Sequence, residues 1–161
     1  MAGLLWAVQP AAEVALVAAT AKTVLRIIPA ATVGVEIVTI GITFDGILPT
    51  GEPVVVEVLG YDTTTGGTKT DITTTYSSTN GQIAKLNDVS WAVQLAAAYA
   101  FTVEPTVVNK LYKRWEIHPQ AGIEILLPLK QEIIVPPSGR IGLRCTAPAA
   151  VNCHPRMEGW E

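Results

Sequence analysis

The stretch that decides the fold is residues 115–145, WEIHPQAGIEILLPLKQEIIVPPSGRIGLRC, in which short apolar runs are separated by turn residues. Apolar and polar residues alternate within each run, and the runs end at PQAG (119–122) and PPSG (136–139). Alternation with a period of two between Gly/Pro breaks is typical of half-buried antiparallel strands. One more alternating segment, 151–160, lies at the end of the chain, where only a strand tied into a sheet is normally ordered. The pattern therefore predicts a compact β scaffold.

Length and composition predict one domain that associates with other chains. The chain has 161 residues, enough to bury a core without disulfides or a metal. Hydrophobic residues make up 49% and charged residues only 16%, against about 25% in typical domains. We expect a protein so poor in charge to hide part of its surface against partners.

Neither a membrane nor a nucleic acid is an expected partner. No window supplies about 18 uninterrupted apolar residues, and the nearest, 11–21, is short and contains Glu13 and Thr20. The N-terminus lacks the basic region of a secretory signal. The net charge is −3, whereas nucleic-acid binding needs a basic face. Lys110, Lys113 and Arg114 form the only basic cluster in the sequence, and we expect it to be the solvated start of a strand.

The pattern divides the chain into an N-terminal arm, 1–19, and a single β-sandwich domain, 20–161. The arm is rich in Ala and Val with weak periodicity, so we expect an arm or short helix that packs on a neighbouring chain. Residues 62–87 are rich in Thr, Ser, Gly and Asn and have little to bury. We expect them to form a long surface excursion with one short strand at 72–76.

About eight strands are expected. Those before the excursion are 20–28, 33–44 and 54–61. The alternation in 33–44 changes phase near Val38 and Thr39, which predicts a β-bulge. Residues 91–103 read as a strand or, given three successive alanines, a short helix. Because no helical pattern is long enough to connect parallel strands, the fold class is all-β, an antiparallel β-sandwich that is jelly-roll-like.

Two cysteines, Cys145 and Cys153, match no zinc or redox motif, and His154 adds only one further possible ligand. They read as small apolar residues on neighbouring strands. A cross-strand disulfide stays open as the alternative, because residues 146–150 can turn the chain back.

The sequence contains no recognisable catalytic motif. His118 and His154 both precede prolines, no Gly-x-Ser-x-Gly elbow is present, and two isolated histidines do not make a metal site. Glycoside hydrolysis needs two facing carboxylates. Glu116, Glu124 and Glu132 lie in expected strands, and Glu116 and Glu124 alternate with apolar neighbours as solvent-facing positions do, so we expect these glutamates to be structural.

Two further patterns also point away from a small-molecule site. GRIG (139–142) is a turn before a strand and not a phosphate-binding loop. The four tryptophans, Trp6, Trp91, Trp115 and Trp160, are spread along the chain as core or interface anchors are. We therefore assign no catalytic, cofactor-binding or metal residue and expect no enzyme.

Four segments resemble a family of small structural proteins of tailed phages, the head decoration or cement proteins. They are TAKTVL (20–25), GITFDG (41–46), EIHPQAG (116–122) and GRIGLRCTAPAAVN (139–152). The resemblance implies a jelly-roll-like domain, made in the host cytoplasm, that assembles as a homotrimer on the major capsid protein of the virion. It carries no motif that marks the contact residues.

Two alternatives remain open at this stage. The sandwich could belong to a tail, head-fibre or receptor-binding component; Tyr61, Tyr76 and Trp91 flank the polar excursion and could mark such a site. It could instead be a carbohydrate-binding module or a cupin-like enzyme, although the shortage of histidines disfavours the cupin.

Overall fold

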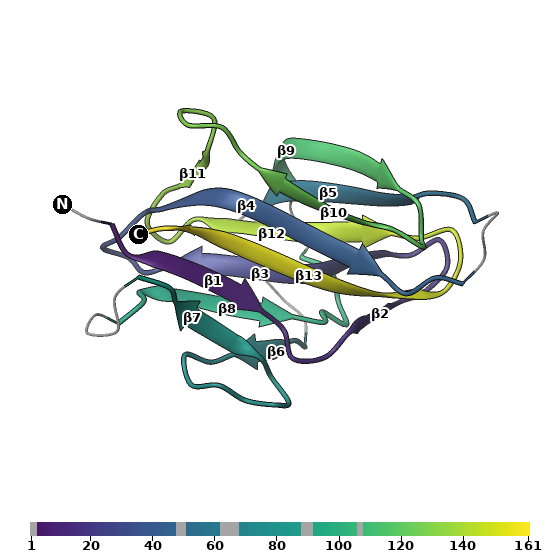
Figure 1. The fold of residues 1–161 in the computed structure, drawn as a ribbon, viewed down its shortest axis with the longest axis horizontal. Helices are drawn as coiled ribbons and strands as arrows, with labels where there is room; N and C mark the ends of the chain where they lie inside the picture. Colours follow the sequence, from purple (N-terminus) through teal and green to yellow (C-terminus); the bar gives the residue numbers. More distant parts are fainter. Residues whose placement is uncertain (1–2, 48–50, 62–67, 88–91, 106–107) are drawn as a thin grey trace.

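The alternating segments form two antiparallel sheets that enclose one hydrophobic core in the computed structural model (Figure 1). The structure describes residues 3–47, 51–61, 68–87, 92–105 and 108–161. Within them the chain forms thirteen strands and no helix: β1 (Leu5–Gln9), β2 (Val14–Leu16), β3 (Ala21–Pro29), β4 (Val35–Phe44), β5 (Val54–Tyr61), β6 (Thr70–Ile72), β7 (Gln82–Lys85), β8 (Leu95–Tyr99), β9 (Val108–Ile117), β10 (Gly122–Leu126), β11 (Ile133–Val135), β12 (Arg140–Thr146) and β13 (Val151–Trp160).

Sheet A has the strand order β10-β4-β13-β1-β7, with β11 also paired to β4 and β2 to β13. Sheet B has the order β6-β8-β3-β12-β5-β9. The chain changes sheet repeatedly, as from β3 to β4, β4 to β5 and β12 to β13. Such switching between two antiparallel sheets is the arrangement of a jelly-roll-like sandwich. The predicted all-β antiparallel β-sandwich is confirmed.

The core lies between the sheets, and β13 shows how the sequence builds it. Its residues alternate between buried and partly exposed from Val151 to Gly159, as the period of two predicts. Met157 is fully buried and lies opposite Ile40 of β4. At Gly159 a Cβ would lie 2.6 Å from the ring of Trp6 and 2.0 Å from the Glu36 carbonyl oxygen, so only glycine leaves room for this packing.

The expected N-terminal arm is wrong for the described residues, which begin at Gly3. Strand β1 lies within sheet A, between β13 and β7, and β2 pairs with β13. Trp6 and Val8 are fully buried. Leu5, Ala7 and Gln9 point to the other side, so the segment is an ordinary alternating strand and neither an arm nor a helix. Its alanines and neighbouring apolar residues concealed this alternation.

The polar excursion is only partly a surface loop. Residues 62–67 lie outside the described residues, while 68–87 contribute β6 to sheet B and β7 to sheet A. The short strand expected at 72–76 is β6, at 70–72. Residues 95–99 form strand β8 and not a helix. The expected count of about eight strands was too low, because β1, β2 and β7 were not expected as strands.

The predicted bulge in the second long strand is confirmed. Glu158 of β13 lies opposite Thr39, and the next residue, Gly159, lies opposite Ile37, so Val38 is the extra residue on β4. The same residue separates β10 from β11, because the Leu127 amide donates to the Val38 carbonyl oxygen at 2.7 Å. The bulge thus fixes where two strands, one after the other, pair with β4.

Candidate interaction face

The outer face of sheet A presents rows of side chains from neighbouring strands, because residues opposite each other in register lie on the same side of a sheet. One row joins Ile134, Glu36, Trp160 and Leu5 across β11, β4, β13 and β1. Two rows further along β13, Glu124, Gly41 and Arg156 lie side by side. The face therefore changes from apolar to polar along the length of β13.

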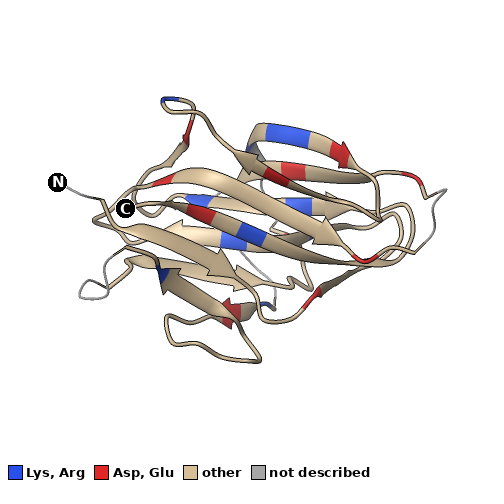
Figure 2. Cartoon of the chain, viewed as in Figure 1, with Lys and Arg blue, Asp and Glu red and all other residues tan. Residues whose placement is uncertain are grey.

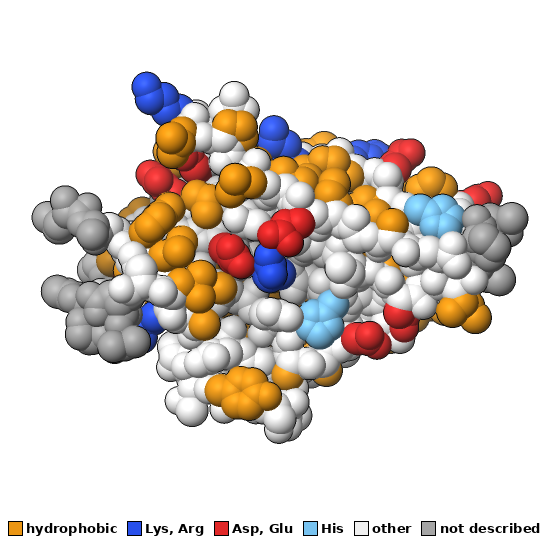
Figure 3. All heavy atoms as spheres, in the orientation of Figure 1, with side chains coloured by type: hydrophobic (Ala, Val, Ile, Leu, Met, Phe, Trp, Pro, Cys, Tyr) orange, Lys and Arg blue, Asp and Glu red, His pale blue; other side chains and the backbone are white. Residues whose placement is uncertain are grey.

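The apolar end of this face consists of Leu126, Leu129, Ile134 and Trp160, named here the apolar patch. Their exposed fractions are 74%, 88%, 67% and 38%. Figure 3 shows hydrophobic side chains gathered at this end of the face, near β11 and the chain termini. A hollow of about 660 Å³ lies among Gly34, Leu129, Ile134 and Trp160. Leu129, Ile134 and Trp160 border the same hollow, and exposed apolar side chains gathered in this way are typical of a protein contact.

The middle of the face holds a ladder of charges. Arg156 Nη2 lies 2.6 Å from Glu124 Oε1 of β10, and Arg156 Nε lies 3.4 Å from Glu158 Oε1. Strand β4 lies between β10 and β13, and the ladder crosses it at Gly41, where an added Cβ would touch Arg156 Nε at 3.7 Å. Figure 2 shows the red and blue segments of β13 and, across β4, the red segment of β10. These exposed ion pairs fix the side chains but contribute little stability.

Residues 100–105, named here the strap, cover the part of sheet B that carries Thr23 and Arg26. Phe101 of the strap is buried, and its ring centre lies 4.7 Å from the Arg26 guanidinium carbon. The Glu104 carboxylate accepts hydrogen bonds at 2.5 Å from the Thr23 amide and at 2.6 Å from the Thr23 hydroxyl. The Thr23 hydroxyl also lies 2.8 Å from the Tyr61 hydroxyl.

Burial beneath the strap changes the acid–base behaviour of two groups. Loss of water raises the pKa of Tyr61 to about 12, and the nearby Glu104 carboxylate acts in the same direction. Burial, followed by the like charge of Arg140, lowers the pKa of Arg26. Arg26 is only 3% exposed, and its Nε and Nη1 have no hydrogen-bond partner. The Phe101 ring and the charge of Asp71 both favour its charged form.

The residues weighed from sequence for catalysis are not assembled into a site. His118 accepts at Nδ1 from the Gln120 amide at 3.2 Å, at the corner after β9. His154 lies on sheet A with Nε2 3.1 Å from the Pro10 carbonyl oxygen. Glu124 is bound in the ladder, and Glu116 lies 3.9 Å from Arg114. No group of three or more His, Cys, Asp or Glu side chains among the described residues is placed to hold a metal.

The two cysteines are free thiols, and both are buried. They lie on consecutive strands, but Cys145 belongs to sheet B and Cys153 to sheet A. Burial raises the pKa of the Cys145 thiol well above its usual value, and Cys153 adds to this effect. A thiol held neutral in this way behaves as a small apolar core residue.

The tryptophans and the basic cluster have separate roles. Trp6 is in the core, Trp115 packs against its edge, Trp160 belongs to the apolar patch, and Trp91 lies outside the described residues. Lys110, Lys113 and Arg114 are exposed on β9, as the sequence predicted. Of the apolar patch, Trp160 was named from the sequence, whereas Leu126, Leu129 and Ile134 were not. A signal for the two leucines is the segment 125–129, ILLPL, which holds more apolar residues than one face of a strand can bury.

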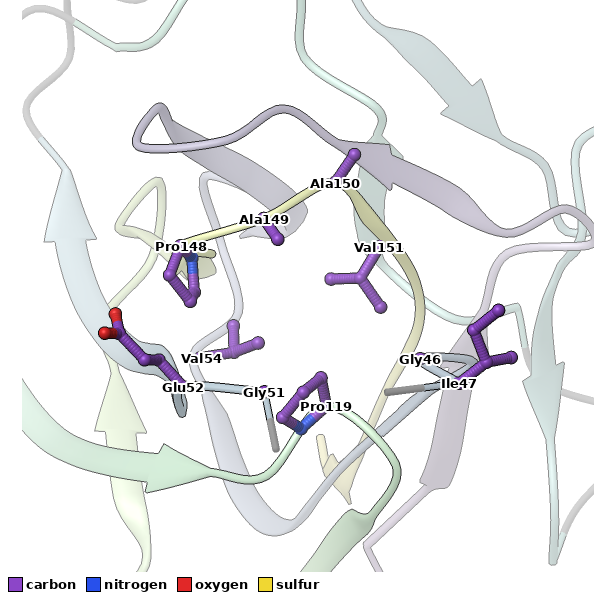
Figure 4. A pocket seen from close by; sticks show the side chains of 10 residues that line it. All are labelled: Gly46, Ile47, Gly51, Glu52, Val54, Pro119, Pro148, Ala149, Ala150 and Val151. Atoms are coloured by element: carbon purple, nitrogen blue, oxygen red, sulfur yellow. The ribbon is translucent and has the colours of Figure 1, made fainter. Parts of the chain in front are cut away.

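A small hollow of about 100 Å³ lies at one end of the sandwich, between the loop before β5 and the loop between β12 and β13. Figure 4 shows Pro119, Pro148 and Val151 bordering it, while the Glu52 carboxylate is directed away from its centre. The residues that line it therefore offer apolar contact and no reactive group.

Comparison of the chain with models of protein families, with curated proteins and with solved structures finds no match. Among the described residues, no helix has the length and apolar character needed to cross a bilayer.

Proposed function

We propose that this chain is a structural virion protein that binds the outer surface of a phage capsid and stabilises the shell. The observation that carries this proposal is the apolar patch on the open face of sheet A. Water-exposed Leu129 and Ile134 gain free energy only when another surface covers them. The low content of charged residues and the resemblance of four segments to cement proteins support the same partner, the major capsid protein.

The patch lies at one end of the sandwich, near both termini, so a contact confined to it leaves the rest of the domain projecting from the shell (Figures 1 and 3). The loop between β10 and β11 carries Leu129 at its exposed position and is the part that would enter a depression on the shell. Self-association as a homotrimer, which the resemblance implies, would then use other surfaces.

The test is co-sedimentation of the purified protein with capsids that lack it. The variant is Leu129→Glu combined with Ile134→Glu, and the matched control is Leu111→Glu, an exposed apolar residue on β9 of sheet B. Burial of each side chain contributes about 1.5 to 3 kcal/mol, so the double variant should bind at least about 100-fold more weakly. The control should sediment with the shells and raise their thermal resistance as the parent does.

The mass measured by light scattering shows whether the patch contacts the shell or another copy of this chain. If the double variant remains a trimer but no longer sediments, the patch binds the shell. If it becomes a monomer, the patch joins copies of this chain, and the assignment to the shell is wrong. A parent protein that ignores the shells altogether would overturn the proposed function.

A further inference from the structure

A second feature of sheet A is a polar groove that the apolar patch does not include. Two hollows of about 510 Å³ and 530 Å³ lie on either side of β13 and share Gln9, His154 and Arg156. Volumes of this size are typical of sites for small molecules or short segments of a polymer. Because the two hollows have these three residues in common, we treat them as one groove, named here the polar groove.

Small residues make the floor of the polar groove. Gly41 and Gly122 line the first hollow, and Gly81 and Ala84 line the second. At Gly122 a Cβ would lie 2.6 Å from the Thr43 methyl carbon and 2.9 Å from the Ile42 carbonyl oxygen, so a side chain there would be strained. The sheet is hollowed here because its outward positions carry so few side-chain atoms.

The walls of the groove carry groups that both donate and accept hydrogen bonds. Gln9 of β1 lies opposite Gln82 of β7, which places two side-chain amides next to each other. Arg156 is fixed by Glu124 and Glu158, so its guanidinium is already oriented. Amide, carboxylate and guanidinium groups each offer two atoms in one plane. That geometry matches neighbouring hydroxyls on a sugar ring, which donate and accept at once.

The charges along the groove select against an anionic ligand. The lining residues include three carboxylates, Glu13, Glu124 and Glu158, against the single guanidinium of Arg156. A phosphate-rich or sulfated polymer would be repelled by this surface, whereas a neutral ligand would not.

An exposed aromatic side chain stands at the rim. Tyr76 lines the second hollow and is 71% exposed. It precedes a tight turn in which Ser77 and Gly81 exchange backbone hydrogen bonds of 3.2 and 2.9 Å. Gly81 has φ +88° and lies so close to β1 that a Cβ would meet the Gln9 carbonyl oxygen at 2.2 Å. The turn therefore lies against β1, and the Tyr76 ring borders the hollow, where the apolar C–H face of a sugar can pack on it.

We propose that the polar groove binds a neutral glycan segment, with Tyr76 as the stacking surface and Gln9, Gln82 and Arg156 as the groups that bind hydroxyls. This activity is separate from shell binding, because Tyr76 and Gln82 lie outside the apolar patch. A virion protein with both surfaces would hold the shell at one end and a glycan along its side.

The experiment is binding of the full chain to an array of neutral gluco-, manno- and galacto-oligosaccharides, with heparin and polysialic acid as anionic counterparts. We expect retention of at least one neutral class and of neither anionic polymer. Tyr76→Ala should weaken binding of that neutral class about tenfold, and Gln82→Ala should also weaken it. Trp160→Ala, which removes an exposed aromatic outside the groove, is the matched control and should bind as the parent does.

Three outcomes would overturn this proposal. They are retention of no neutral oligosaccharide, preference for heparin or polysialic acid, and equal binding by the parent and Tyr76→Ala. Thermal unfolding of Tyr76→Ala should match that of the parent, because the side chain is exposed. Tyr76→Ala should also sediment with capsids, so failure of glycan binding and failure of shell binding are measured separately.

Discussion

The two outer faces of the sandwich are made of similar strands but meet different surroundings. On sheet B the chain covers part of its own face: the strap packs Phe101 on Arg26, and Glu104 binds Thr23. On sheet A the corresponding surface is open, and it carries the apolar patch and the polar groove. A chain that covers Arg26 with its own strap but leaves Ile134 and Leu129 exposed to water has an apolar surface available for a partner.

The largest expected effect comes from a substitution that removes the cover of Arg26 on sheet B. Phe101→Ala should destabilise the domain by about 3 to 5 kcal/mol, because it deletes a buried ring and uncovers the Arg26 guanidinium. Urea unfolding measures this loss. Val103→Ala, at an exposed position of the same strap, is the control and should change the stability by less than about 0.5 kcal/mol. Equal effects of the two changes would show that the strap is not a structural cover.

The stability of the domain at alkaline pH tests the burial of Tyr61 beneath the strap without any substitution. The pKa of Tyr61 is about 12 in the folded state and 10.0 for an unperturbed side chain. Because the folded state holds this proton more tightly, the stabilisation is complete below pH 10 and is lost between about pH 10 and pH 12. The full loss amounts to about 3 kcal/mol.

The measurement is urea unfolding between pH 8 and pH 11.5, with Tyr61→Phe as the comparison. The variant should lose stability less steeply above pH 10. Some slope should persist, because burial also raises the pKa of Cys145 above its usual 9.0, which has the same sign. Identical slopes for parent and variant would contradict the buried state of the Tyr61 hydroxyl.

The smallest effect is expected on the open face. Glu124→Gln removes the negative charge from the 2.6 Å contact with Arg156, but both side chains are substantially exposed. We expect a loss of less than about 1 kcal/mol, reduced further at high salt. Thermal unfolding at low and high ionic strength measures it. A loss of several kcal/mol would mean that the ladder, and with it the face of sheet A, has a structural role comparable to that of the strap.

Much of the fold could be predicted from the sequence because strand periodicity is a local signal. The alternation of β13 and the phase change at Val38 both reproduce the observed register. Strand β1 was missed because Leu4, Leu5 and Trp6 are three consecutive apolar residues, which hide the period-two alternation of the strand. The segment expected to be an arm is a strand because it pairs with β13 and β7, and the sequence of a short segment does not reveal such partners.

The candidate face could not be predicted in the same way, because coverage is a tertiary property. The strap covers Arg26 on sheet B and leaves Ile134 on sheet A exposed. No local sequence pattern predicts that Phe101 packs over Arg26. The ladder likewise depends on β10 and β13 both pairing with β4 at Gly41. Those three segments are far apart in the sequence.

The central claim is that the apolar patch of sheet A is the surface that meets the shell. Hydrogen–deuterium exchange of the protein, free and bound to capsids, tests it most directly. The claim predicts that binding slows exchange in residues 127–135 and in the last residues of β13, and leaves the strap at 100–105 unchanged. Slower exchange in the strap or along β9, with residues 127–135 unaffected, would contradict it.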